Sequence, residues 1–166
     1  MQYLYCQKEK GFTLLEVILS FWIILIGLVA ILSLLFVIFS SFNVSVHKII
    51  AANLAQEGIE VVRNIRDSNW LQGKVWNEGL SAGDYRVQYN SQSLLPYSDT
   101  PLRRDSTGLY SYDFGNNTIF YRKITIIDNP DNDINTEDIG VRAVVFWKDH
   151  GKERSLQVED RLYNWQ

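Results

Sequence analysis

The chain has 166 residues, of which 46% are hydrophobic and 21% are charged, and its formal net charge at pH 7 is −3. This length accommodates one domain of ordinary size, and the sequence contains no basic run of the kind that binds nucleic acid through charge. The single cysteine, Cys6, precedes the apolar region, so the domain that follows is expected to rely on packing, or on packing and a bound ion, rather than on a disulfide.

The first third of the chain predicts a membrane-spanning helix. Residues 17–39 are apolar apart from Ser20, Gly27 and Ser33, and about 20 apolar residues in a helix cross a hydrocarbon core of roughly 30 Å. Two lysines, at positions 8 and 10, precede this run, and positive charge favours the cytoplasmic side of a membrane. We therefore expect a single span whose amino terminus lies in the cytoplasm.

Residues 43–69 continue the helix with a one-sided pattern. Their apolar residues recur at spacings of four and seven, which places them on one helix face; with a glycine in the same stripe, this face comprises Val46, Ile50, Leu54, Gly58, Val61 and Ile65. No proline occurs before Pro96, and proline is the residue that most strongly interrupts a helix. The sequence therefore predicts one helix from residue 12 to about residue 68.

The remainder of the chain predicts an antiparallel sheet. Four segments have the alternating, β-branched or aromatic composition of strands, at residues 85–89, 118–127, 141–147 and 155–165. An antiparallel sheet commonly buries one face, and the apolar face of the long helix is the candidate cover. Residues 90–117 contain two prolines and form a long excursion of unpredicted path. The expected fold class is α+β, with a sheet of about four strands.

The most specific signal is the segment from Lys10 to Val17, which reads Lys-Gly-Phe-Thr-Leu-Leu-Glu-Val. A short basic leader ends in Gly11, the aromatic Phe12 follows, and Glu16 is the fifth residue from that point. This order resembles the processing site of type IV pilins and type II secretion pseudopilins. The resemblance implies a pilin-like fold, cleavage between Gly11 and Phe12 by a prepilin peptidase, and N-methylation of Phe12.

The resemblance also divides the chain and gives it a location. It implies a single-pass protein of the cytoplasmic (inner) membrane that later enters a cell-surface or periplasmic filament. The implied segments are a cleavable leader (1–11), a transmembrane half-helix (12–42), an amphipathic half-helix (43–69) and a β-sheet domain outside the cytoplasm (70–166). The implied partners are the peptidase, the bilayer, an inner-membrane assembly platform and other pilin or pseudopilin subunits.

Glu16 is a functional candidate on physical grounds as well. A carboxylate in a membrane segment costs roughly 2.5–3.5 kcal/mol, although Glu16 lies only about 6 Å along the helix from Phe12 and so near the membrane surface. In the resembled family, the new amino terminus of one subunit meets this carboxylate in a neighbour, which implies pairing of Phe12 with Glu16 between copies. The alternative is an interfacial glutamate that favours a helix amino end.

A second, looser resemblance links scattered positions to minor pilins of the PilV and GspI type. It rests on residues 52–60, on the three helix positions Arg63, Arg66 and Trp70, and on the later positions Phe120, Arg122, Trp147 and 162–165. It implies a minor subunit that is present in a few copies at a fibre tip and primes assembly. The charged residues of this helix also fit surface pairs three or four residues apart.

An acidic segment late in the chain is a calcium candidate. Calcium takes 6–8 oxygen ligands, and alternating oxygen-bearing side chains occur at Asp131, Asp133, Asn135, Glu137 and Asp138. Thr136 stands where an EF-hand loop requires glycine, and such residues are also common in solvated turns. We expect no other cofactor.

The sequence does not predict an enzyme. The two histidines, His47 and His150, are not accompanied by a Gly-rich phosphate loop or by a cysteine nucleophile after the apolar run. Two alternatives to a filament subunit remain: a tip adhesin or ligand-binding module that uses residues 90–117, and an anchored domain that does not polymerise. The sequence leaves open whether the filament belongs to a pilus, a secretion system or a DNA-uptake apparatus.

Overall fold

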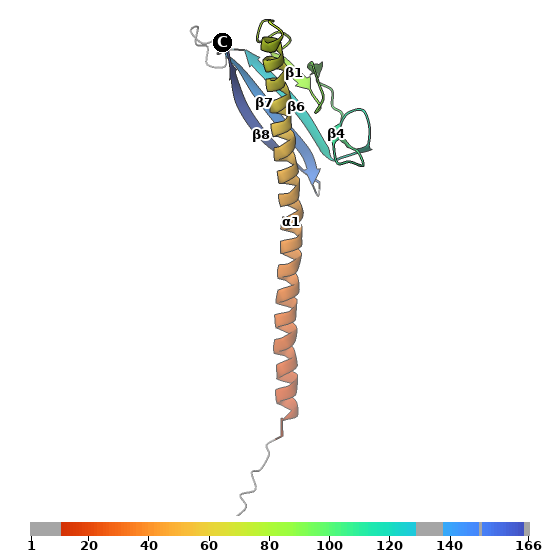
Figure 1. Ribbon diagram of the computed structural model, residues 1–166. Coiled ribbons are helices and arrows are strands. Elements are labelled where there is room, and N and C mark those ends of the chain that lie inside the picture. The colour runs from red at the N-terminus through yellow and green to blue at the C-terminus, as the bar shows by residue number, and fades with distance from the viewer. Residues whose placement is uncertain (1–10, 129–137, 150, 165–166) are drawn as a thin grey trace, which may run out of the picture. The chain divides into compact units, whose positions relative to one another are not determined.

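The computed structural model describes residues 11–128, 138–149 and 151–164, apart from the side chain of residue 40 (Figure 1). Within these residues, one helix is followed by eight strands: α1 (Leu14–Leu71), β1 (Gly83–Arg86), β2 (Leu95–Pro96), β3 (Arg103–Arg104), β4 (Tyr110–Ser111), β5 (Asn116–Asn117), β6 (Phe120–Asp128), β7 (Asp138–Asp149) and β8 (Lys152–Tyr163). The chain divides into two compact units, Met1–Asn43 and Val44–Gln166, here called the first and the second unit.

The described part of the first unit is a short extended segment followed by helix. The helix begins at Leu14 rather than at the predicted residue 12, because Thr13 caps it: the backbone N–H of Glu16 donates to Thr13 Oγ1 at 3.3 Å. Every side chain from residue 11 to residue 39 is exposed. Within the described residues, α1 is the one helix long and apolar enough to cross a membrane.

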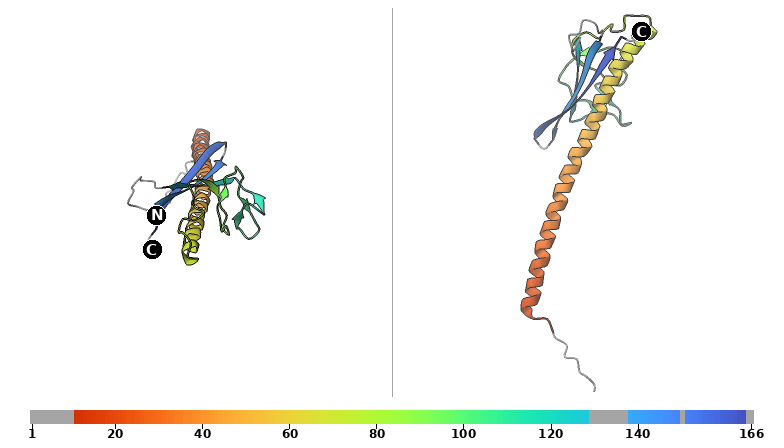
Figure 2. Two further views of the ribbon diagram at one scale, coloured as in Figure 1. Left: turned by 90° about the horizontal axis from the view of Figure 1, so that it is seen from above. Right: turned by 90° about the vertical axis from the view of Figure 1, so that its left-hand side faces the viewer.

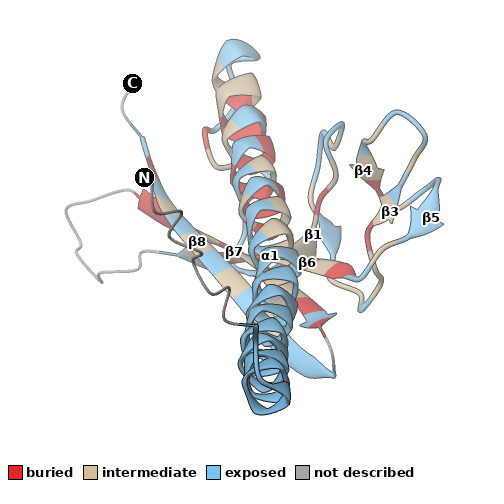
Figure 3. Ribbon diagram, turned by 90° about the horizontal axis from the view of Figure 1, so that it is seen from below, coloured by how far each residue is buried: buried red, intermediate tan, exposed pale blue. Residues whose placement is uncertain are grey.

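In the second unit, residues 44–71 of α1 cover one face of a five-stranded antiparallel sheet (Figures 1 and 2). The predicted apolar face is confirmed, since Leu54, Gly58, Val61 and Ile65 are buried and Val46 and Ile50 are half-buried. In Figure 3 the buried positions form a stripe along this part of the helix. The stripe is wider than predicted, because four neighbouring residues are also buried: Ala51, Ala55, Ile59 and Val62.

The five-stranded sheet has the order β2-β1-β6-β7-β8. The prediction of about four strands was one too few, because β2 is a two-residue strand that contains Pro96 and has no alternating pattern. The three long strands were predicted in the right places, and alternate residues of β6 and β7 point into the core. β1 ends earlier than predicted because the chain turns after it, with the N–H of Ser91 donating to the Gln88 carbonyl at 2.9 Å.

Residues 90–117 supply β2 and a second, three-stranded sheet of order β4-β3-β5. The fully buried Leu102 anchors this sheet to the core, and its backbone pairs with Phe120 and Thr118 at 2.8 and 2.9 Å. At Gly115, a Cβ atom would lie 2.4 Å from the Arg104 carbonyl oxygen, so this turn requires glycine.

Candidate functional site

The predicted processing site lies just outside α1. Gly11 and Phe12 are both exposed and precede the first helical residue, Leu14. A peptide bond in this position has no intrahelical hydrogen bond to break before a peptidase can bind it. The Gly11–Phe12 bond is therefore accessible both sterically and energetically.

Glu16 lies in the first turn of α1. Its backbone is fully engaged, since its N–H donates to Thr13 and its carbonyl accepts from the Ser20 hydroxyl at 2.8 Å. Among the described residues, no hydrogen bond or ion pair holds its carboxylate. A shallow, mostly apolar hollow of about 250 Å³ is present on the same turns, lined by Phe12, Val17, Ser20, Phe21 and Ile24. The Glu16 carboxyl group, with no partner among the described residues, thus stands among exposed apolar side chains.

The calcium prediction falls mostly outside the described residues. Asp131, Asp133, Asn135 and Glu137 belong to the segment that is not described. Asp138 begins β7, is buried, and faces Arg161 of β8 with 3.8 Å between the carboxylate and guanidinium groups. Among the residues that the structure describes, no group of three metal-ligating side chains is present, and calcium binding stays a prediction.

Arg122 is a buried cation, and neither its burial nor its partners were predicted from the sequence. It is 1% exposed and donates to three oxygen atoms from two other segments: Leu54 O at 2.8 Å, Glu57 Oε1 at 2.9 Å and Val87 O at 2.6 Å. Its position in the alternating pattern of residues 120, 122, 124 and 126 was the available signal, because that face of the strand points into the core. These contacts join α1, β6 and the segment after β1.

Gly58 makes room for this arrangement. A Cβ atom at this position would lie 2.7 Å from Ile124 Cδ1 and 3.2 Å from Arg122 Cδ. A contact under 3.0 Å requires a shift, which here falls on the end of the Ile124 side chain and on the Arg122 side chain. Gly58 therefore leaves room for these two side chains of β6 beneath α1.

The charged residues of the helix pair partly as expected. Arg63 bonds Glu60 one turn away at 2.6 Å, and it also bonds Asp160 of β8 at 2.7 Å. The hydrogen bond that Arg63 donates to the Asp160 carboxylate raises the pKa of Arg63 above its ordinary value. Glu57 instead pairs with the buried Arg122, which links the helix to the sheet rather than along its own surface.

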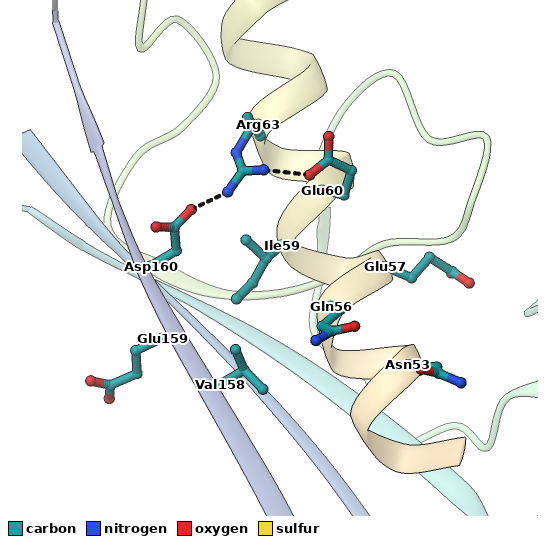
Figure 4. Close-up of a pocket in the computed structure, with 9 residues that line it drawn as sticks. All are labelled: Asn53, Gln56, Glu57, Ile59, Glu60, Arg63, Val158, Glu159 and Asp160. Atoms are coloured by element: carbon teal, nitrogen blue, oxygen red, sulfur yellow. Dashed lines mark hydrogen bonds and ion pairs between the residues drawn. The ribbon is translucent and has the colours of Figure 1, made fainter. Parts of the chain in front are cut away.

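A groove of about 620 Å³ runs between α1 and β8 (Figure 4). Two of its lining residues are apolar, Ile59 and Val158; the polar ones are Asn53, Gln56, Glu57, Glu60, Arg63, Glu159 and Asp160. Four carboxylates against one guanidinium give this groove a formal charge of −3.

Comparisons with family models, with curated proteins and with solved structures find no match to this chain.

The excursion of residues 90–117 contains tyrosines that take part in hydrogen bonds within the fold, and it also contains exposed apolar residues. The Tyr112 hydroxyl donates to the Arg122 carbonyl at 3.3 Å, and burial raises the pKa of Tyr97 to about 12. Leu109 and Phe114, in contrast, are 47% and 60% exposed. This segment therefore presents a small apolar surface on a hydrogen-bonded frame.

Proposed function

We propose that this chain is a minor subunit of a type IV pilus-like filament, a minor pilin or pseudopilin with a pilin-like fold, and not an enzyme. The observation that carries the proposal is the order of features around residues 10–17: a basic leader, Gly11, Phe12 and Glu16, then a long apolar run. Each feature alone is common, but in this order they resemble the processing site of type IV pilins and type II secretion pseudopilins.

Processing is the first step of the proposed function. A prepilin peptidase cuts between Gly11 and Phe12, removes the leader and methylates the amine of Phe12. The exposure of this bond and its place before the first helical turn support the step. The apolar segment stays in the mature subunit, whereas an ordinary secretory leader loses its apolar region on cleavage.

Docking through Glu16 is the second step. The subunit waits as a single-pass protein in the cytoplasmic membrane, with its amino terminus in the cytoplasm and the second unit outside. On assembly, lipid contacts of residues 12–42 are exchanged for contacts with other subunits' helices. The carboxylate of Glu16, which has no partner among the described residues, then pairs with the charged amine of a neighbour's Phe12. This pairing neutralises both groups in an apolar surrounding and fixes the axial register.

Substitution of Glu16 tests the docking step. Glu16→Gln keeps the shape of the side chain and removes its charge, so we expect normal membrane insertion and loss of incorporation into filaments. Glu60→Gln is the matched control, because it removes a glutamate from the second unit. Filaments are purified and the subunit is quantified by mass spectrometry. Normal incorporation of the Glu16→Gln subunit would overturn the docking step.

The same spectra test processing. We expect a mature chain that begins with N-methylated Phe12. Purified filaments whose subunit still carried residues 1–11 would contradict the whole proposal. An intact, unmethylated chain in cells that contain the peptidase would favour the anchored domain that does not polymerise.

A tip adhesin is the second candidate, favoured by the exposed Leu109 and Phe114. Replacing both with serine leaves the buried anchor Leu102 in place, so the fold is expected to persist. Fibre number and adhesion are then measured separately. Unchanged fibre number with lost adhesion would support a binding role, and unchanged adhesion would exclude this surface.

A further inference from the structure

The five-stranded sheet has two very different edges (Figure 1). β2 is two residues long and contains Pro96, which are two of the features that protect a sheet edge from adding strands. β8 is twelve residues long, contains neither proline nor glycine, and has no described strand on the side away from β7. Such an edge can add another strand through its backbone N–H and C=O groups, although the N–H of Arg161 already donates to Asp160 Oδ1 at 2.9 Å.

We propose that β8 pairs with β8 of a second copy of this chain. The two strands run antiparallel about a two-fold axis through Gln157 and join the two five-stranded sheets into one. Alternate residues of β8 face α1 and the others face solvent. A register centred on one residue brings like faces together, so both helices lie on the same side of the joined sheet.

Charge complementarity selects this register. With Gln157 opposite its own copy, the facing pairs are Glu153 with Arg161, Arg154 with Asp160, Ser155 with Glu159, and Leu156 with Val158. Each opposite-charge pair occurs twice by symmetry, and no like charges face each other. Opposite charges across an antiparallel pair stabilise it, and like charges destabilise it.

Neighbouring registers are less favourable. Moving the axis to Leu156 places Glu153 opposite Glu159, and moving it to Val158 leaves no pair of opposite charges. The axis can also pass between two residues. Between Gln157 and Val158 it places Arg154 opposite Arg161, and between Leu156 and Gln157 it places Glu153 opposite Asp160, so like charges meet in both registers. Among these registers, only the axis at Gln157 gives two kinds of opposite-charge pair and no like-charge pair.

The groove between α1 and β8 is a second feature that fits the same occupant (Figure 4). In the proposed pair, Arg154 of the second copy lies beside Asp160, at the rim of a groove with a formal charge of −3. Leu156 of the second copy lies beside Val158, next to Ile59. Asp160 already accepts from Arg63, but each carboxylate oxygen has more than one lone pair. The second copy thus supplies a cation and an apolar group where the groove is acidic and apolar.

The geometry fixes how the two second units lie in such a pair. A two-fold axis perpendicular to the sheet reverses every direction within the sheet, so residues 44–71 of the two copies run in opposite directions. The pairing is a contact between second units, which goes beyond the docking of Glu16 on Phe12 in the proposed function.

Cysteine cross-linking tests the pairing and its register. The full chain is solubilised in detergent with Cys6→Ser, so that each added cysteine is the only one. Directly opposite residues have Cα atoms roughly 4.5–5.5 Å apart, within disulfide range, so Gln157→Cys is expected to give covalent dimers under mild oxidation. Ser155→Cys lies on the same face but about 13 Å from its own copy, and is expected to stay monomeric. Equal dimer formation by both variants, or by neither, would overturn the proposal.

Charge reversal gives an independent test in the Gln157→Cys chain. Glu153→Arg and Arg161→Glu each place like charges in two facing pairs, so each variant alone is expected to pair about tenfold more weakly. When the two variants are mixed, both facing pairs again join opposite charges, and cross-linked heterodimers should return to the original level. Circular dichroism checks the fold, since Arg161 also contacts Asp138. No recovery in the mixture would contradict the proposed register.

Discussion

The two units solve the problem of apolar surface in different ways. In the first unit, every side chain from residue 11 to residue 39 is exposed, including large apolar ones. In the second unit, the apolar stripe of the same helix is buried against a sheet that the chain itself supplies. A helix that is apolar on all sides therefore needs lipid or another chain to cover it, whereas a helix with one apolar stripe is covered by its own sheet.

Removing the buried cation should give the largest effect and would test how the second unit holds its helix. Arg122→Met keeps most of the packed volume but leaves Glu57 and two carbonyl groups without their donor. We expect a loss of about 3 kcal/mol in the free energy of unfolding, measured by urea denaturation. Arg142→Met is the control, because Arg142 pairs with Glu159 on the exposed face, where an ion pair contributes under about 1 kcal/mol.

A charge introduced into the first unit should impair membrane insertion without changing the stability of the second unit. Leu28→Lys is expected to oppose membrane insertion by roughly 2.5–3.5 kcal/mol, while the urea midpoint of the second unit stays unchanged. Insertion is measured by carbonate extraction of membranes. If the substitution instead unfolded the second unit, the independence of the two regions would be wrong.

Two glycines of α1 allow a matched comparison. Gly58→Ala should destabilise the second unit by about 1–3 kcal/mol, because the new methyl group meets Ile124 and Arg122. Gly27→Ala should not lower its stability, since nothing lies within 4 Å of a Cβ at that position. Thermal unfolding of both variants provides the measurement, and equal losses would remove the contrast.

The smallest effect concerns acid stability of the second unit. The hydroxyl of Thr125, and then Lys123, lower the pKa of Asp84 below its ordinary value of 3.8. A lowered pKa in the folded state contributes stability that is present above pH 3.8 and is lost as the pH falls through the folded-state pKa. Asp84→Asn should therefore flatten the decline in melting temperature below pH 4. An unchanged slope would show that Asp84 does not contribute.

The sequence predicted the helix and the long strands, because the repeat of apolar residues that is typical of each can be recognised within a short stretch of the chain. The helix start differed by two residues, since Thr13 acts as a cap that the apolar pattern does not reveal. β2 and the sheet β4-β3-β5 consist of two-residue strands, which are too short to show an alternating pattern in the sequence.

The candidate site was predictable to a different degree. The positions of Gly11, Phe12 and Glu16 follow from one short motif, and the structure adds their exposure. The pairing of Arg122 could not be predicted in full, because its partners lie 35 to 68 residues away along the chain. The groove beside β8 likewise arises only when Arg63 and Asp160 come together, 97 residues apart.

The contacts of Arg122 and Arg63 have a mechanical consequence. They fasten α1 to the sheet at Leu54 and at Arg63, which are nine residues, or about 14 Å, apart along the helix axis. A pulling force applied along α1 loads both fastenings in shear, together with the apolar residues between them, instead of peeling them open one after the other. Tension that enters the helix at residue 44 is thus transmitted to both β6 and β8.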